Sequence, residues 1–186
     1  MDVWEIKYRP ALKSDLKFLL DLRIQTMNQH LIASSLPVSD EAHLQRIEYQ
    51  FVHATIIEIS KCAIGLLKVH RQANNIELIQ IQVAPSYQGK GIGTRILNDL
   101  IKEATESEKT ITLSVLKTNP AKGLYLSVGF KIVAETDDSY LMLFEKECLN
   151  SRYCKMYKVS IIIGVISFYL LSIFFKLGKS IAVNPI

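Results

Sequence analysis

The feature that most constrains this chain is a glycine-rich turn between a strand-like segment and a helix-like one. The apolar run at residues 76–83 stops before Pro85, three glycines alternate at positions 89, 91 and 93, and a helical pattern begins directly afterwards. Glycine adopts positive φ without strain and has no Cβ to keep a ligand away from the backbone. The start of a helix offers free N–H groups and the positive end of its dipole to an anion. We therefore interpret this turn as a binding site for a pyrophosphate group.

The spacing within the turn separates it from two other phosphate-binding motifs. A P-loop carries Lys and then Ser or Thr after its last glycine, whereas Thr94 and Arg95 follow Gly93 here. A dinucleotide-binding turn has the order Gly-x-Gly-x-x-Gly early in the fold, with an acidic residue about 20 positions later. This chain has Gly-x-Gly-x-Gly in its middle. The run from Gln88 to Gly93 instead matches the signature Gln/Arg-x-x-Gly-x-Gly/Ala.

The formal net charge of +4 is concentrated in the C-terminal part of the chain. Residues 1–148 hold 17 Lys and Arg against 18 Asp and Glu, for a net charge of −1, while residues 149–186 hold five basic residues and no acid. A nucleic-acid-binding domain shows a clustered excess of Lys and Arg. The first 148 residues lack that excess, so we expect no nucleic-acid partner.

Cysteine and histidine show no metal-binding or disulfide pattern. The three cysteines form no Cys-x-x-Cys pair and the four histidines are scattered, so we expect no metal. The first residues are not basic and precede no apolar run of the kind found in signal peptides, and we expect a cytoplasmic protein with reduced thiols. We expect Cys62 to be buried, because free cysteines usually are, and the histidines to lie at the surface or to make local hydrogen bonds.

The rest of the sequence alternates between strand and helix patterns. Alternating or β-branched runs predict strands near residues 3–9, 54–60, 61–70, 76–83, 110–116, 130–134 and 140–146. Apolar residues at spacings of three and four predict helices near residues 15–32, 40–51, 92–107 and 119–128. This order predicts an α/β or α+β domain with a mixed sheet.

A second motif lies between Leu113 and Phe130. This run holds Asn119 before a proline, the pair Leu124 and Tyr125, and a Gly-Phe pair at its end. Together with the glycine-rich turn, in this order and at this separation, it resembles the GCN5-related N-acetyltransferase (GNAT) superfamily. The resemblance implies a mixed, mostly antiparallel central sheet flanked by helices, and acetyl-CoA as the cosubstrate.

The resemblance assigns cofactor binding to residues around the turn. In the family, the preceding strand splays away from its neighbour and its backbone hydrogen-bonds the pantetheine arm, and the N–H groups of the turn hold the pyrophosphate. Lys90 would be a nearby cation, and a solvated loop position is an equal alternative for it. Asn119 either contacts the cofactor or caps its helix. The implied cofactor-binding set is Ile81, Val83, Gln88, Gly89, Lys90, Gly91, Gly93, Thr94 and Asn119.

The resemblance also places two catalytic residues. Tyr125 matches the position of the family's usual general acid, which protonates the departing thiolate of coenzyme A. A tyrosine hydroxyl is neutral at pH 7 and able to donate, and the alternative for Tyr125 is a core aromatic. Glu77 lies 11 residues before Gln88, where histone-acetylating members place a general base.

Strand alternation places Glu77 on one face with Ile79, Ile81 and Val83. Such an apolar setting would raise the pKa of its carboxyl group towards neutrality. A surface or substrate-anchoring role for Glu77, with water removing the proton of the amine, stays open.

The resemblance covers residues 1–148, and residues 149–186 form a basic, hydrophobic tail. Within the tail, residues 159–175 carry no charge and would span about 25 Å as a helix, the short end of what crosses a bilayer. Basic residues precede this run, so we expect a C-terminal membrane anchor with the domain on the cytoplasmic side. A hydrophobic helix buried against the domain, or against a second copy in a homodimer, is the alternative.

The resemblance implies an N-acetyltransferase that moves an acetyl group from acetyl-CoA to a primary amine, on a small molecule or a protein, by direct transfer in a ternary complex. The alternative is a non-catalytic acyl-CoA-binding regulatory module on the same fold, anchored to a membrane or not. An intact turn together with Tyr125 favours the enzyme, because a sensor has no use for a general acid.

Overall fold

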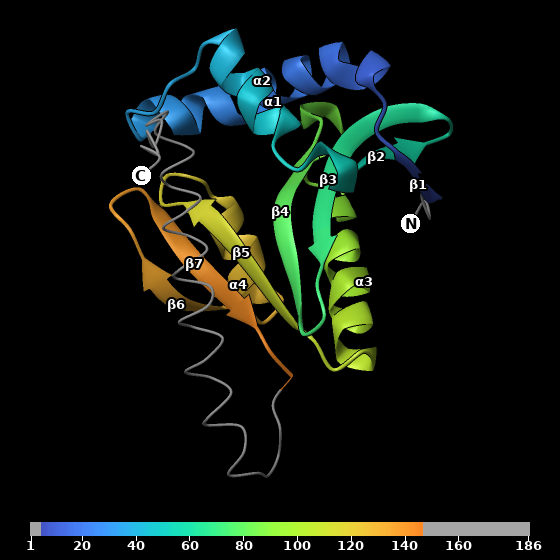
Figure 1. Cartoon of the computed structure of the whole chain (residues 1–186), viewed down its shortest axis with the longest axis vertical. Helices are drawn as coiled ribbons and strands as arrows, with labels where there is room; N and C mark the ends of the chain where they lie inside the picture. The colour runs from blue at the N-terminus through green and yellow to red at the C-terminus, as the bar shows by residue number, and fades with distance from the viewer. Residues whose placement is uncertain (1–4, 147–186) are drawn as a thin grey trace, which may run out of the picture. The chain divides into compact units, whose positions relative to one another are not determined.

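The computed structural model describes residues 5–146, and the chain divides into the units Met1–Lys146 and Glu147–Ile186. The first unit is built on a seven-stranded sheet (Figure 1) in the order β1-β2-β3-β4-β5-β7-β6. The strands are β1 Ile6–Pro10, β2 Ala54–Ile59, β3 Cys62–Arg71, β4 Asn75–Val83, β5 Thr110–Leu116, β6 Lys131–Glu135 and β7 Ser139–Phe144. The helices are α1 Leu16–Ala33, α2 Asp40–Glu48, α3 Ile92–Glu106 and α4 Ala121–Ser127, with short 3₁₀ turns η1 Lys13–Asp15, η2 Phe51–His53 and η3 Pro85–Tyr87.

Only one pair of neighbouring strands in the sheet is parallel. β4 and β5 run in the same direction, and every other neighbouring pair is antiparallel. The parallel pair is joined through α3, as a parallel connection requires a long crossover. The prediction of a mixed, mostly antiparallel sheet flanked by helices is therefore confirmed.

The expected C-terminal hydrophobic helix at residues 159–175 lies outside the described residues. Among residues 5–146, no helix combines the length and the apolar character that crossing a membrane requires.

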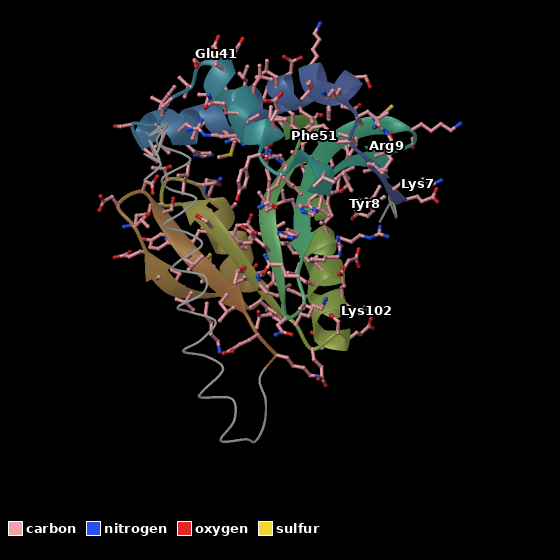
Figure 2. All side chains as sticks on the ribbon, viewed as in Figure 1. Lys7, Tyr8, Arg9, Glu41, Phe51 and Lys102 are labelled. Carbon is pink, nitrogen blue, oxygen red and sulfur yellow. The ribbon has the colours of Figure 1, made fainter. Side chains whose placement is uncertain are left out.

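Two apolar cores lie on the two faces of the sheet. The core on the α3 and α4 face includes the buried stripe of α3, formed by Ile92, Ile96, Leu97, Leu100 and Ala104. The core on the α1 and α2 face is smaller and consists of Leu19, Leu22, Ile47, Ala54, Ile56 and Leu66. Charged residues on the outer faces of the helices, such as Glu41 on α2 and Lys102 on α3, point away from the sheet (Figure 2).

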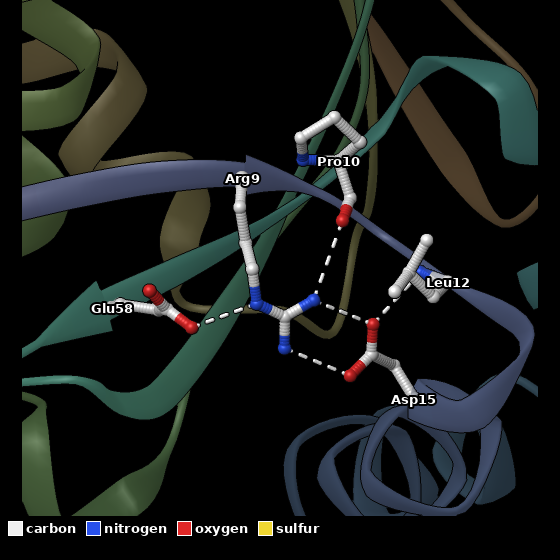
Figure 3. Close-up of polar contacts among 5 residues, drawn as sticks. All are labelled: Arg9, Pro10, Leu12, Asp15 and Glu58. Atoms are coloured by element: carbon white, nitrogen blue, oxygen red, sulfur yellow. Dashed lines mark hydrogen bonds and ion pairs between the residues drawn. The ribbon is translucent and has the colours of Figure 1, made fainter.

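The edge strand β1 is paired with β2, and Arg9 adds side-chain contacts to β2 and to the start of α1 (Figure 3). Nε of Arg9 donates to Glu58 on β2 at 2.8 Å, and its two terminal nitrogens donate to the carboxylate of Asp15 at 2.8 and 2.9 Å. Asp15 also accepts the backbone N–H of Leu12 at 2.8 Å. The pKa of the Asp15 carboxyl is lowered, chiefly by its hydrogen bonds with Arg9. This network fixes the path from β1 into α1.

A β-bulge interrupts the regular alternation of β4. On β3, Lys68 and Val69 are consecutive, but their partners on β4 are Gln80 and Leu78. Ile79 is therefore an extra residue on β4, and the faces to which later side chains point are shifted by one position.

Two expectations about buried residues are wrong. Cys62 is exposed, because it directly follows the two-residue turn formed by Ser60 and Lys61, both at positive φ, and begins β3 at the rim of the sheet. His43 is fully buried, at 0% exposure, because it lies on the face of α2 that packs against α1 rather than on its solvent face.

Candidate functional site

The central feature of the site is the place where β4 and β5 separate. The two strands pair from Asn75 opposite Thr110 to Leu78 opposite Leu113, and the pairing then ends. β4 nevertheless continues to Val83 and β5 to Leu116. Figure 1 shows the two strands diverging from this point. The fork leaves one backbone edge of β4 without a neighbouring strand in the described part of the chain, so its N–H and C=O groups are available to an extended ligand.

The glycine-rich turn lies at the open end of β4. Gly89 and Gly91 have φ values of +70° and +77°, which side chains with a Cβ rarely adopt. A Cβ added at either glycine would meet no atom within 4 Å, so the glycines leave open space on their ligand-facing side. Gly91 is the N-cap of α3, and no side chain caps its first N–H groups. Among the described residues, the first turn of α3, which includes Thr94, therefore offers uncapped N–H groups to an anion.

Two side chains of the turn hold its shape. Nε2 of Gln88 donates to the backbone carbonyl of Val83 at 2.8 Å, which fixes the turn to the end of β4. The ammonium group of Lys90 lies 5.4 Å from the centre of the Tyr87 ring, a distance typical of a cation–π contact. The roles of Gln88 and Lys90 beside a pyrophosphate stay predictions.

Tyr125 lies on α4, in the core that also contains the buried stripe of α3. It is 7% exposed, and its ring contacts Phe130 edge to face at a centroid distance of 5.8 Å. Burial raises the pKa of its hydroxyl to about 12, so the hydroxyl keeps its proton at neutral pH. The residue before it, Leu124, reaches the start of α3, because a Cβ on Gly93 would lie 3.3 Å from its methyl group. α4 thus brings Tyr125 to the same end of the sheet as the turn.

Asn119 caps α4 and joins it to α1. Its Oδ1 accepts the backbone N–H of Ala121 at 2.9 Å, and its Nδ2 lies 3.9 Å from the sulfur of Met27. The adjacent Thr118 donates to the carbonyl of His30 at 3.0 Å. The capping interpretation of Asn119 agrees with this geometry, and the loop after β5 is fixed against α1.

The face predicted for Glu77 is wrong. Ile81 and Val83 pack against the α3 core, and so do Ile76 and Leu78. Because side chains alternate along a strand, Glu77, which lies between Ile76 and Leu78, points to the opposite face. The bulge at Ile79 causes the error, because it shifts the alternation between Glu77 and Ile81 by one residue. Oε2 of Glu77 lies 3.8 Å from Nδ1 of His70. Glu77 therefore faces the α1 and α2 side, among polar residues rather than apolar ones.

A row of polar side chains along the α1 face of β4 was not predicted. Gln80 donates to Gln82, and Nε2 of Gln82 donates to the hydroxyl of Thr26 on α1 at 2.7 Å. Thr26 in turn donates to the carbonyl of Leu22 at 2.7 Å. The sequence signal for this row is the pair of glutamines at alternate positions of an otherwise apolar strand. Together with Glu77 they form a polar surface beside the fork.

A metal centre is not built into the described region. Within residues 5–146, no three His, Cys, Asp or Glu side chains lie close enough to hold a metal ion. The geometry instead combines a turn for an anion, a fork for an extended ligand, a buried hydroxyl donor and a polar surface.

Comparisons with known proteins agree with this geometry. The family model described as an acetyltransferase (GNAT) domain matches residues 26–139, more than half of the chain. No curated protein matches the chain.

Many solved structures have a similar fold. PaiA N-acetyltransferase from Thermoplasma acidophilum, in complex with coenzyme A, has 18% identity and a TM-score of 0.60, covering 76% of this chain and 99% of its own. The ribosomal-protein-S18-alanine N-acetyltransferase from Escherichia coli has 19% identity and a TM-score of 0.57, with 79% and 97% covered. Arabidopsis thaliana Naa50, in complex with the bisubstrate analogue CoA-Ac-MVNAL, has 16% identity and a TM-score of 0.54, with 76% and 99% covered. At these identities the similarity establishes the fold alone.

Proposed function

Because the chain belongs to the GNAT acetyltransferase family, we propose that it is an N-acetyltransferase that moves an acetyl group from acetyl-CoA to a primary amine by direct transfer in a ternary complex. The observation that carries the proposal is the open end of β4, where pairing with β5 stops and the start of α3 has no side-chain cap.

The residues present fit acetyl-CoA. The positive-φ glycines and the start of α3 would hold its pyrophosphate, with Lys90 as the nearby cation. The free edge of β4 at Ile81 and Val83 would hydrogen-bond the pantetheine arm as a neighbouring strand would. When bound, acetyl-CoA supplies an activated thioester. The fork would direct that thioester towards the point where strand pairing ends.

The transfer requires two proton movements, one away from the acceptor amine and one to the departing thiolate. The acceptor amine must lose a proton as its nitrogen bonds to the acetyl carbon, and Glu77 or a water molecule takes it. The carbon–sulfur bond breaks, and the hydroxyl of Tyr125 donates its proton to the departing thiolate. A hydroxyl pKa of about 12 keeps Tyr125 protonated before the reaction, and reprotonation from solvent restores it afterwards.

The test is amine-dependent release of the coenzyme A thiol from acetyl-CoA by the full-length protein. Pools of small amines and of peptides with free N-termini or lysines serve as acceptors, and mass spectrometry identifies the acetylated product. We expect release that depends on an amine. Tight acetyl-CoA binding without release from any pool would contradict the enzyme and favour a regulatory acyl-CoA-binding module.

We also propose that residues 159–175 anchor the chain to a membrane, on the strength of their uncharged sequence. The full-length protein should sediment with membranes, and a chain ending at Asn150 should not. Equal recovery of both chains in the supernatant would contradict the anchor.

A further inference from the structure

Basic side chains are buried together between α1, α2 and β3. We call Arg23 on α1, His43 on α2 and Lys68 on β3 the buried basic cluster. Arg23 is 7% exposed, and the other two are 0% exposed. Arg46 on α2 lies beside the cluster, because its charge acts on both Arg23 and His43.

All three hydrogen bonds that the Lys68 ammonium group can donate go to the C-terminal end of α2. Its ammonium group donates to the backbone carbonyls of Ile47 at 2.7 Å, Tyr49 at 2.8 Å and Arg46 at 3.4 Å. Burial lowers the pKa of Lys68 to about 8. Lys68 therefore stabilises the C-terminal end of α2 and has little capacity left for a ligand.

Arg23 and His43 are different, because their buried nitrogens are unsatisfied. Nε of Arg23 and both ring nitrogens of His43 are shielded from solvent and have no hydrogen-bond partner within residues 5–146. Arg23 also forms no ion pair in that region. Leaving a buried polar group without a hydrogen-bond partner is unfavourable, and more so when the group is charged.

The charges around Arg23 make an anion the appropriate partner. Burial and the charge of Arg46 lower the pKa of Arg23 to about 10, so Arg23 still carries its charge at neutral pH. Arg46 and Lys68 add positive charge, and Asp40 is the acid that acts on His43. A water molecule would satisfy hydrogen bonds but would leave this excess charge in place. A carboxylate would satisfy the guanidinium with two parallel hydrogen bonds and neutralise it.

The cluster adjoins the polar row beside the fork. Arg23 precedes Thr26 by three residues on α1, which is about 4.5 Å along the helix axis, and Thr26 accepts a hydrogen bond from Gln82. Lys68 is the cross-strand partner of Gln80, which donates to Gln82. The unsatisfied nitrogens therefore lie next to the polar row of β4, beside the fork that would direct the thioester.

We propose that Arg23, assisted by His43, is a carboxylate-binding subsite, and that the acceptor is an amine carrying a carboxylate a few bonds from the reacting nitrogen. This inference rests on the proposed function, since it assigns a substrate class to the same site. Arg23 is the charged partner, and the neutral imidazole of His43 donates one N–H.

The experiment compares acceptors that differ only in charge. The full-length protein is assayed at saturating acetyl-CoA with amino acids and with their carboxamides. The variants are Arg23→Gln and, as a matched control, Lys17→Gln, which removes a charge from the exposed face of the same helix. Carboxamides have more acidic amines than amino acids, so the informative quantity is the change in the carboxylate-to-amide ratio of kcat/KM between proteins.

We expect this ratio to fall about ten- to a hundredfold in Arg23→Gln, the size of one charge-assisted contact. The loss should appear in KM, because the subsite binds substrate without taking part in the chemistry. Lys17→Gln should keep the wild-type ratio within about twofold. An unchanged ratio in Arg23→Gln would overturn the proposal.

Thermal unfolding with unreactive ligands tests the subsite without turnover. N-acetyl amino acids should raise the melting temperature of the wild-type protein and of Lys17→Gln but not of Arg23→Gln, and their amides should have no Arg23-dependent effect. If no amine is acetylated in any assay, the proposed function fails while this measurement still decides whether the subsite exists. An Arg23-dependent shift with inorganic phosphate and none with carboxylates would indicate a site for free anions and would overturn the assignment to the acceptor.

Discussion

At the scale of single residues, Lys68 shows how a buried charge becomes structural. The Lys68 side chain is fully buried, and its ammonium group donates hydrogen bonds to three backbone carbonyls at the end of α2. The last carbonyls of a helix have no partner within the helix, and a cation there also interacts favourably with the helix dipole. The strand pattern 61–70 predicted β3 but not this role, because a single lysine among apolar residues does not indicate which helix end lies above it.

Lys68→Met should therefore destabilise the protein although it replaces a charged side chain by an apolar one of similar length. The carbonyls of Ile47 and Tyr49 would stay buried without a donor, at a cost of about 2–4 kcal/mol. Urea unfolding measures the loss, and Lys102→Met on the exposed face of α3 is the control. A variant as stable as the wild type would show that water replaces the ammonium group.

His43 should make stability depend on pH. Burial, and then the charges of Arg23 and Arg46, lower its pKa in the folded state, whereas the unfolded chain protonates His43 near the ordinary value of about 6.5. Below that pH the unfolded state binds more protons, so the free energy of unfolding falls as the pH decreases. His53, whose pKa is also lowered, contributes in the same direction.

Urea unfolding at a series of pH values from about 7.5 to 5 measures this dependence. His43→Gln should flatten the slope below about pH 6.5. An identical slope in His43→Gln and the wild type would mean that His43 titrates equally in both states.

At the scale of elements, the sequence predicted the glycine turn and the bounds of β4 well, but not the faces to which the side chains of β4 point. The alternating glycines and the following helical period predicted the strand, turn and helix at nearly the observed bounds. The bulge at Ile79 was not predicted, although the two consecutive apolar residues Leu78 and Ile79 break the alternation of apolar and polar residues at that point. The wrong face for Glu77 followed from that omission. The burial of Arg23 was also not predicted. The helical periodicity was read from apolar residues, and α1 buries an arginine among them.

Gly91→Ala should weaken acetyl-CoA binding and lower stability. The φ of +77° at this position costs a residue with a Cβ about 1–2 kcal/mol, and the methyl group would enter the open space left for the pyrophosphate. Calorimetric titration with acetyl-CoA and thermal unfolding measure the two effects.

Gly123→Ala is the matched control for that substitution. Gly123 lies on the exposed side of α4, with no positive φ and nothing within 4 Å of an added Cβ. Alanine there should raise stability by about 0.5–1 kcal/mol and leave acetyl-CoA binding unchanged. Equal effects of the two substitutions would contradict the role assigned to the turn.

At the scale of the whole molecule, local patterns predicted the order of strands and helices, whereas the fork could be expected only from the resemblance to the family. Each element has its own periodicity, and two motifs in the right order identified the family. The fork arises where β4 and β5 stop pairing after Leu78 and Leu113, a relation between residues more than 30 positions apart that local patterns do not contain.

The unit Met1–Lys146 should fold without the rest of the chain, because both apolar cores and the whole sheet belong to it. A protein ending at Lys146 should melt cooperatively and bind acetyl-CoA with the affinity of the full-length protein. Loss of cooperative melting would show that residues 147–186 are needed for the fold.

We expect Tyr125 to donate a proton in the chemical step and to contribute nothing to the binding of acetyl-CoA. The measurement is kcat for amine-dependent thiol release by Tyr125→Phe, together with calorimetric titration of the same variant with acetyl-CoA. Phenylalanine keeps the contact with Phe130 and removes the proton donor, so we expect kcat to fall about a hundredfold or more with acetyl-CoA affinity unchanged. A kcat equal to that of the wild type would contradict the account and assign the proton of the thiolate to another group.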